Sequence, residues 1–153
     1  MGTIRFAVIA AVLLAVSGCG TLQVSEEAGN LPKPIKVGFA GVSLMPGVTL
    51  PDEDLAVMDK LSREAMKEQG GDCYVYTDQK ETVDVLLSMT GTDTWRALLG
   101  TNLQLTLKGE LLREKKEVFK LADMWAMPRW PSSAKAAALQ IKSILCTGRQ
   151  KLL

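Results

Sequence analysis

The sequence predicts an α/β fold, in the form of a two-layer α+β sandwich with the element order β-α-β-β-β-β-α. Three observations favour this class. An alternating apolar segment precedes a segment of helical periodicity, four further alternating segments follow, and a second helical segment comes last. The first strand–helix–strand unit is expected to be a right-handed crossover, and the later strands an antiparallel meander. Two helices then cover one face of a mixed, mostly antiparallel sheet.

The first strand is predicted over 35–42, because Ile35, Val37 and Phe39 alternate with polar or small residues. The loop after it, 43–51, is unusually apolar. Two interpretations fit this loop. It either folds over one end of the sheet or forms a lip that binds a partner.

The first helix is predicted over 52–69. Acidic residues stand in its first turn, apolar residues recur at spacings of three and four, and Gly70 ends the pattern. The second helix is predicted to begin at an N-cap serine, Ser132 or Ser133, and to end at Gly148.

The remaining strands are expected at 72–77, 83–89, 103–112 and 117–126. The alternation at the start of the third of these predicts a half-buried antiparallel strand. A charged hairpin tip separates the last two. Residues 91–100 fit either a continued strand or a loop, and we favour the loop.

The first 18 residues have the features of a secretory signal peptide. One positive charge, Arg5, precedes an apolar run that is too short to span a bilayer, and small residues follow. The run ends in Val16-Ser17-Gly18-Cys19, which resembles the bacterial lipobox. In lipoproteins with this motif the cysteine thiol carries a diacylglycerol and the chain is cut just before it. A transmembrane helix over 4–18 is the alternative.

The domain organisation follows from this motif. We expect a lipoprotein signal peptide at 1–18, a flexible tether at 19–34 and a single α/β domain at 35–153. The tether is predicted because its residues are polar, interrupted by glycine and proline, and lack an apolar period. An edge strand over Leu22–Val24 is the alternative. Gly20 favours the outer membrane, since aspartate at this place holds lipoproteins in the inner membrane.

Composition excludes several classes of function. The chain has 18 Lys+Arg and 17 Asp+Glu, which argues against an electrostatic nucleic-acid binder. It has no histidine, so Ser-His-Asp, Cys-His and His-ligated metal chemistry are excluded. Ser132 and Lys135 have Ser-x-x-Lys spacing, but the motifs that accompany it in penicillin-recognising enzymes are absent and a helix cap explains the serine. We expect no enzymatic activity, cofactor or metal.

Cys73 and Cys146 remain once Cys19 carries lipid. An oxidising compartment favours a disulfide between them. The predicted topology argues against it, because it places the two cysteines at opposite ends of the sheet unless residues 127–132 cross the sheet first. The pairing stays open on these grounds.

The arrangement resembles the small outer-membrane lipoproteins of Gram-negative bacteria known as the Sbal-type family. The residues that carry the resemblance are the lipobox at Val16–Cys19, the strand–helix–glycine succession from Ile35 to Gly71, and Thr92–Trp95 before a strand and a charged hairpin. Other envelope accessory lipoproteins and the amino-terminal domain of the Tol translocation protein have a similar shape. The resemblance implies location and fold, and no activity.

Trp95 and Trp130 are the candidate contacts for a ligand or partner, with Trp125 as a third large aromatic. They either line a pocket or plug the ends of the sheet. Lys115 and Lys116 are interpreted as a solvated turn, with contact to anionic lipid as the alternative.

The sequence therefore predicts a lipid-anchored envelope protein on the outer membrane, facing the periplasm. Its expected role is that of a non-enzymatic accessory or scaffold subunit of a membrane-associated complex, with the membrane and another envelope protein as partners and no nucleic acid. The alternative is a periplasmic binding module for a lipid, glycan or peptide ligand.

Overall fold

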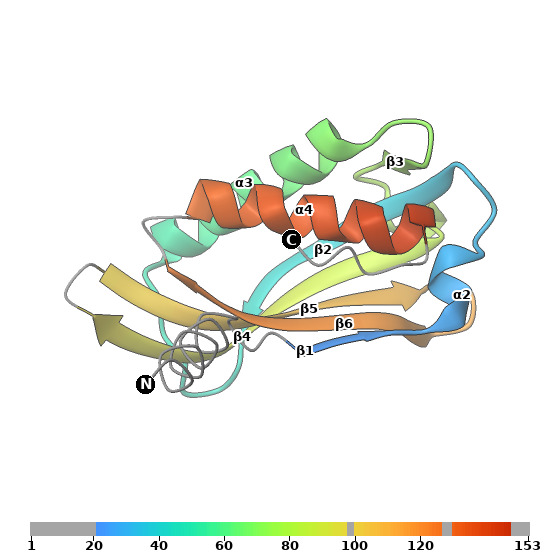
Figure 1. Ribbon diagram of the computed structural model, residues 1–153. Helices are drawn as coiled ribbons and strands as arrows, with labels where there is room; N and C mark the ends of the chain where they lie inside the picture. Colours follow the sequence, from blue (N-terminus) through green and yellow to red (C-terminus); the bar gives the residue numbers. More distant parts are fainter. Residues whose placement is uncertain (1–20, 98–99, 127–129, 148–153) are drawn as a thin grey trace, which may run out of the picture.

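A computed structural model describes residues 21–97, 100–126 and 130–147. Two long helices, α3 (Asp52–Gln69) and α4 (Trp130–Thr147), lie together over one face of a six-stranded sheet (Figure 1). The predicted fold class, a two-layer sandwich of helices on a mixed sheet, is confirmed.

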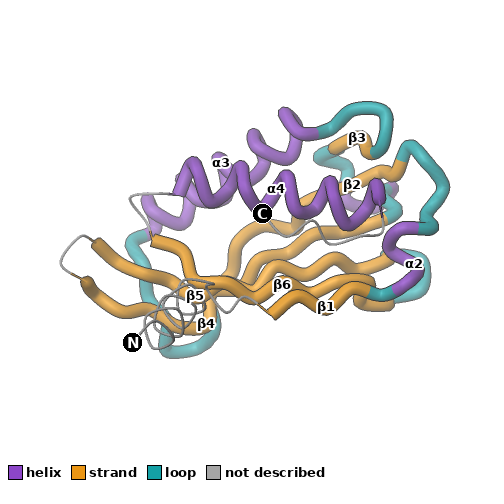
Figure 2. The backbone as a smooth tube through the Cα atoms, viewed as in Figure 1, coloured by secondary structure: helices purple, strands orange, loops and turns teal. Residues whose placement is uncertain are grey.

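The sheet has the strand order β1-β6-β5-β4-β2-β3. β2 runs parallel to β3 and β4, and the pairs β4–β5, β5–β6 and β6–β1 are antiparallel. The strands are β1 (Thr21–Val24), β2 (Ile35–Leu44), β3 (Tyr74–Tyr76), β4 (Val85–Ala97), β5 (Gly100–Leu111) and β6 (Lys116–Ala126). Two short helices, α2 (Glu26–Gly29) and the 3-10 turn η1 (Lys80–Thr82), complete the described elements (Figure 2).

The core lies between the sheet and the helices. Alternate strand residues such as Phe39, Leu87 and Leu107 are fully or almost fully buried, and Met58 and Ile141 meet them from the helices. The intervening strand positions face away from the helices and are largely polar. This burial pattern explains why period-two alternation predicted the strands and a three-to-four spacing predicted the helices.

Residues 21–34 correct the prediction of a flexible tether over 19–34. Thr21–Val24 pair with β6, and α2 follows with Ala28 completely buried. The physical reason is that β6 offers an open edge whose backbone groups a passing segment can satisfy. The alternative, an edge strand over Leu22–Val24, is confirmed as part of β1.

The second correction concerns residues 91–100, for which a loop was favoured. β4 continues to Ala97 and pairs with β5 as far as Gly100, with an irregularity in register between Gly91 and Asp93. We call the outer part of this hairpin, residues 91–97 and 100–105, the arm. Backbone pairing with β5 holds these polar positions in a strand, although they lack a clear apolar alternation.

The apolar loop after β2 folds over the end of the sheet. Val48 and Leu50 are partly buried against the core, while Met45 at the tip is 49% exposed. The Met45 N–H donates to the Gly91 carbonyl at 2.8 Å, and the Val48 N–H donates to the Met45 carbonyl at 3.0 Å. The loop is therefore an ordered turn fastened to β4.

One feature of the topology was not predicted. β3 and β4 both run parallel to β2 and lie on either side of it, so the segment 77–84 crosses β2. The Thr77 and Asp84 N–H groups donate to the carbonyls of Val37 and Lys36, each at 2.9 Å. The crossing passes over Gly38, where a Cβ atom would lie 2.9 Å from Cγ1 of Val83. A glycine at this position makes the close approach possible.

Candidate functional site

The lipobox residues 16–19 lie outside the described part of the structure, as does the predicted signal peptide over 1–18. The described chain begins with β1 at Thr21, two residues after Cys19. Among the helices in the described ranges, none is both long and apolar enough to cross a membrane.

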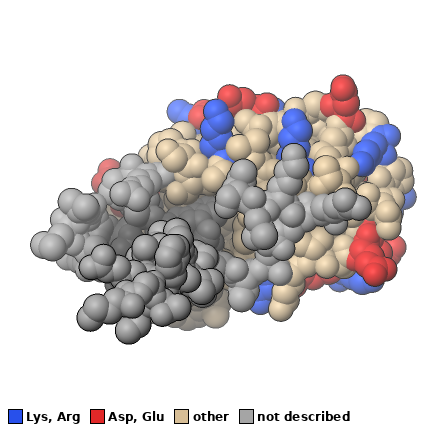
Figure 3. Space-filling view, viewed as in Figure 1, with Lys and Arg blue, Asp and Glu red and all other residues tan. Residues whose placement is uncertain are grey.

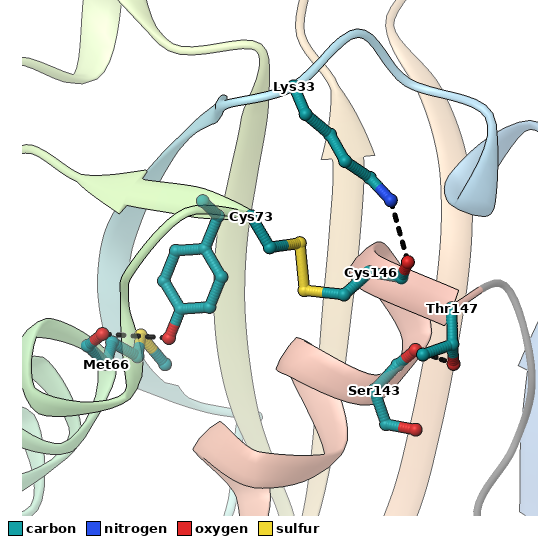
Figure 4. Close-up of a disulfide and its surroundings, with 7 residues drawn as sticks. Lys33, Met66, Cys73, Ser143, Cys146 and Thr147 are labelled. Carbon is teal, nitrogen blue, oxygen red and sulfur yellow. Dashed lines mark hydrogen bonds between the residues drawn. A yellow bond between two sulfur atoms is a disulfide. The ribbon is translucent and has the colours of Figure 1, made fainter.

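Cys73 and Cys146 form a disulfide, with their Cα atoms 5.7 Å apart (Figure 4). The topological argument against this pair was wrong because it took β4 as antiparallel to the strand before it. Since β3 and β4 both run in the direction of β2, the later strands and α4 are reversed relative to the prediction. Cys146 therefore lies at the same end of the molecule as Cys73.

A lysine from the loop before β2 bonds to the end of α4, beside the disulfide. Lys33 Nζ donates to the Cys146 carbonyl at 2.7 Å, and Thr147 Oγ1 donates to the Ser143 carbonyl at 2.7 Å (Figure 4). A cation at this place complements the negative end of the helix dipole. The disulfide and Lys33 together fasten the end of α4 to the segments that lead into β3 and β2.

Among the three tryptophans, the structure describes the side chain of Trp130. Trp130 is 1% exposed, and its Nε1–H donates to the Met58 carbonyl at 3.3 Å, so its prediction as a ligand or partner contact is corrected: it belongs to the core between α3 and α4. Trp95 lies on the arm opposite Asn102, and Trp125 lies on β6 opposite Leu103. The side chains of Trp95 and Trp125 are outside the described structure.

A polar cluster that was not predicted surrounds Arg63 on α3. Its guanidinium donates to both Asp59 oxygens at 2.6 and 3.3 Å, to the Phe39 carbonyl at 3.1 Å and to the Tyr76 hydroxyl at 3.1 Å. Tyr76 donates to Asp78, which also accepts from Lys67 at 3.1 Å.

Hydrogen bonding to Asp59 raises the pKa of Arg63, and the hydrogen bond from Lys67 lowers the pKa of Asp78. These groups satisfy one another, so the cluster is a clamp between α3, β2 and β3. The i,i+4 spacing of Asp59 and Arg63 is the one sequence signal that points to it.

Lys115 and Lys116 take separate roles at the β5–β6 turn. Lys115 has a positive φ of 50° and is exposed, which fits the predicted solvated turn. Lys116 forms an ion pair with Glu27 of α2. The hydrogen bond from Lys116 lowers the pKa of Glu27 to about 2 and in turn raises the pKa of Lys116.

Two surface hollows flank β3, and Val75, 50% exposed, lines both of them. They have volumes of about 240 and 270 Å³; the remaining lining residues are Pro34, Lys36, Thr77, Gln79 and Thr82 on one side and Lys67, Gly70, Gly71, Tyr74 and Tyr76 on the other. Within the described ranges no three His, Cys, Asp or Glu residues are grouped to hold a metal. Ser132 and Lys135 are both exposed in the first turns of α4.

No protein-family model matches the sequence, and no curated protein does so significantly. Solved structures are similar in fold. A PelC variant dodecamer from Paraburkholderia phytofirmans is 14% identical, with a TM-score of 0.55 over 84% of this chain and 97% of that one. TolB from Acinetobacter baumannii is 5% identical, with a TM-score of 0.49 over 86% of this chain and 32% of TolB. The lipoprotein GNA1162 from Neisseria meningitidis is 14% identical, with a TM-score of 0.44 over 72% of this chain and 99% of that one.

Proposed function

We propose that this protein is a lipid-anchored lipoprotein of the bacterial envelope, held through Cys19 on the outer membrane and facing the periplasm. We place it with the small Gram-negative lipoproteins of the Sbal-type family as a non-enzymatic accessory or scaffold subunit. Its partners are the membrane, through the lipid, and another envelope protein.

The disulfide between Cys73 and Cys146 is the main observation in favour of a location in the bacterial envelope. Disulfides persist in oxidising compartments such as the periplasm and are rare in the cytosol. The resemblance of Val16–Cys19 to a lipobox independently supports export and a lipid on Cys19. Since each buried methylene contributes about 0.8 kcal/mol, two or three acyl chains on one cysteine hold a protein of this size stably.

The free edge at β3 supports a docking role. Val75 projects from this three-residue strand between the two hollows, a form suited to an extended segment that adds to the sheet. The buried position of Trp130 removes one of the two aromatics on which the alternative, a binding module, depended. The PelC chain of similar fold assembles with copies of itself, so a second copy belongs among the candidate partners.

Cys19→Ala tests the anchor. We expect this variant in the soluble periplasmic fraction, whereas the unmodified protein stays with membranes and its N-terminal peptide carries the mass of a diacylglycerol. Ser17→Ala is the matched control, because it keeps a small residue in the lipobox and should leave membrane attachment unchanged. Continued membrane attachment of the Cys19→Ala protein would refute the anchor.

The accessory role is tested separately on the lipidated protein, extracted in mild detergent from its own membranes. A complex of constant stoichiometry, measured by native mass spectrometry, is expected for a scaffold subunit. A monomer that retains a lipid, glycan or peptide through purification would instead establish the binding module.

A further inference from the structure

We propose that the turn 45–50, here the Met45 loop, rests on the same lipid surface that holds the acyl chains of Cys19. The domain then docks on the membrane by one defined end instead of moving freely on a tether. This inference depends on the lipid attachment proposed above.

The sheet register places the start of β1 and the end of β2 at one level. Thr21 pairs with Ala122, and the same row continues through Thr106 and Thr90 to Ser43. This row crosses five neighbouring strands, so Thr21 and Ser43 are separated by about 19 Å, four strand spacings. β1 begins at this row and β2 ends one residue beyond it, on the side of the row from which the arm extends (Figure 1).

Cys19 is two residues before Thr21, and Met45 is two residues after Ser43. Two residues span at most about 7 Å, so the lipid-bearing cysteine stays close to the start of β1. A long tether is excluded by the pairing of Thr21–Val24 with β6. The membrane surface must therefore come within a few residues of this row.

The Met45 loop has the chemistry of a lipid contact. Met45 is 49% exposed at its tip and Pro46 and Gly47 are exposed beside it, while Val48 and Leu50 hold the turn on the core. No charged residue occurs from 37 to 51. Burying an exposed methionine in the acyl boundary is favourable, and the loop brings no charge that would have to be desolvated with it.

The charges nearest to the loop along the chain are Asp52, Glu53 and Asp54, which stand in the first turn of α3 and so belong to the helix layer. The opposite end of the sheet holds the Glu27–Lys116 ion pair, Lys33 and the exposed residues of the β5–β6 turn. In Figure 3, charged side chains gather over the helix layer and at the end that holds α2. We leave the arm outside the proposed surface, since it carries Asp93 and Arg96.

The test places an environment-sensitive fluorophore on Met45→Cys in the lipidated full chain, reconstituted in phosphatidylcholine vesicles with a spin-labelled lipid as quencher. The new thiol is the one available for labelling, because Cys19 carries lipid and Cys73 is paired with Cys146. Val75→Cys is the matched control: Val75 is 50% exposed, like Met45, but it lies near the opposite end of the sheet.

We expect lipid-borne quenching of the Met45 probe to exceed that of the Val75 probe at least about threefold, and to be the same at low and high salt because phosphatidylcholine carries no net charge. Equal quenching of both probes on vesicles that carry the protein would overturn the inference and leave the anchor intact. Failure of the protein to float with the vesicles would refute the anchor, and the inference with it. Protection of the Met45 probe in soluble Cys19→Ala protein that disappears on dilution would assign the loop to a contact between copies instead.

Discussion

At the scale of single residues, lysine and arginine side chains donate hydrogen bonds to backbone carbonyls at a strand irregularity and at a helix end. Arg63 and Lys80 donate to the carbonyls of Phe39 and Ala40, where the register of β2 shifts, and Lys33 donates to the last turn of α4. Lys116 instead pairs with Glu27 and so fastens α2 to the β5–β6 turn. These contacts join segments far apart in sequence, and each depends on the fold for its partner.

The Glu27–Lys116 pair predicts a specific acid sensitivity. The pKa of Glu27 is lowered from 4.5 to about 2 in the folded protein, mainly by the hydrogen bond from Lys116. The unfolded chain therefore binds a proton first, and the pair's contribution to stability is present above pH 4.5 and lost as the pH falls toward 2. Glu27→Gln should flatten the stability curve in this window, as followed by urea unfolding at several pH values.

Lys116→Gln serves as the matched variant because it removes the other partner. It should flatten the same window, and salt should weaken the effect in the unmodified protein, since both groups are exposed. An unchanged acid-side slope in both variants would contradict the assignment.

At the scale of elements, the crossing of β2 by residues 77–84 decides the arrangement of the whole sheet. A hairpin between β3 and β4 would make these strands antiparallel neighbours. Instead the crossing segment bonds to Val37 and Lys36 and packs on Gly38, which places β4 on the other side of β2 and parallel to it. Because β5, β6 and α4 follow β4 in alternating directions, the direction of β4 sets the direction of each of them.

Gly38→Ala should lower the free energy of unfolding by about 1–3 kcal/mol, because the added Cβ would lie 2.9 Å from Val83 Cγ1. Val83→Ala removes that methyl group. In a double-mutant cycle measured by chemical denaturation, the alanine at position 38 should therefore cost less when position 83 is also alanine. Strict additivity of the two substitutions would show that the crossing does not depend on this contact.

At the scale of the whole molecule, the disulfide joins the first half of the domain to its last helix. Cys73 and Cys146 are 73 residues apart, and closing a loop of that length in the unfolded chain corresponds to about 4 kcal/mol in the chain-entropy model. The bond also fastens α4, which covers the core, to the β3 edge.

Cys146→Ser should therefore lower the free energy of unfolding by up to about 4 kcal/mol and the melting temperature by roughly 10–20 °C. Cys73→Ser should give the same loss, and the double variant no more than either single one, because each change breaks the same bond. Calorimetry of the soluble Cys19→Ala form measures this. Free thiols at both positions in unreduced protein would show that the bond does not form.

The sequence by itself determined the features that depend on local pattern and composition: the strands and helices with a clear apolar period, and the classes of chemistry that are excluded. Alternation of Ile35, Val37 and Phe39 and the helical spacing over 52–69 identify elements, because burial on one face imposes a period on the chain. The absence of histidine excluded whole classes of chemistry. The resemblance of Val16–Cys19 to a lipobox rests on consecutive residues, so the prediction of an anchor needs no fold.

Only the tertiary structure decided which segments meet. Thr21–Val24 become a strand because β6 offers its edge, β4 continues past Gly91 because β5 pairs with it, and Trp130 is buried because α4 packs against α3. The Cys73–Cys146 bond depended on the direction of β4, which the crossing over Gly38 sets. Strand direction and long-range pairing arise from contacts between distant residues, and such contacts leave no period in the sequence around either partner.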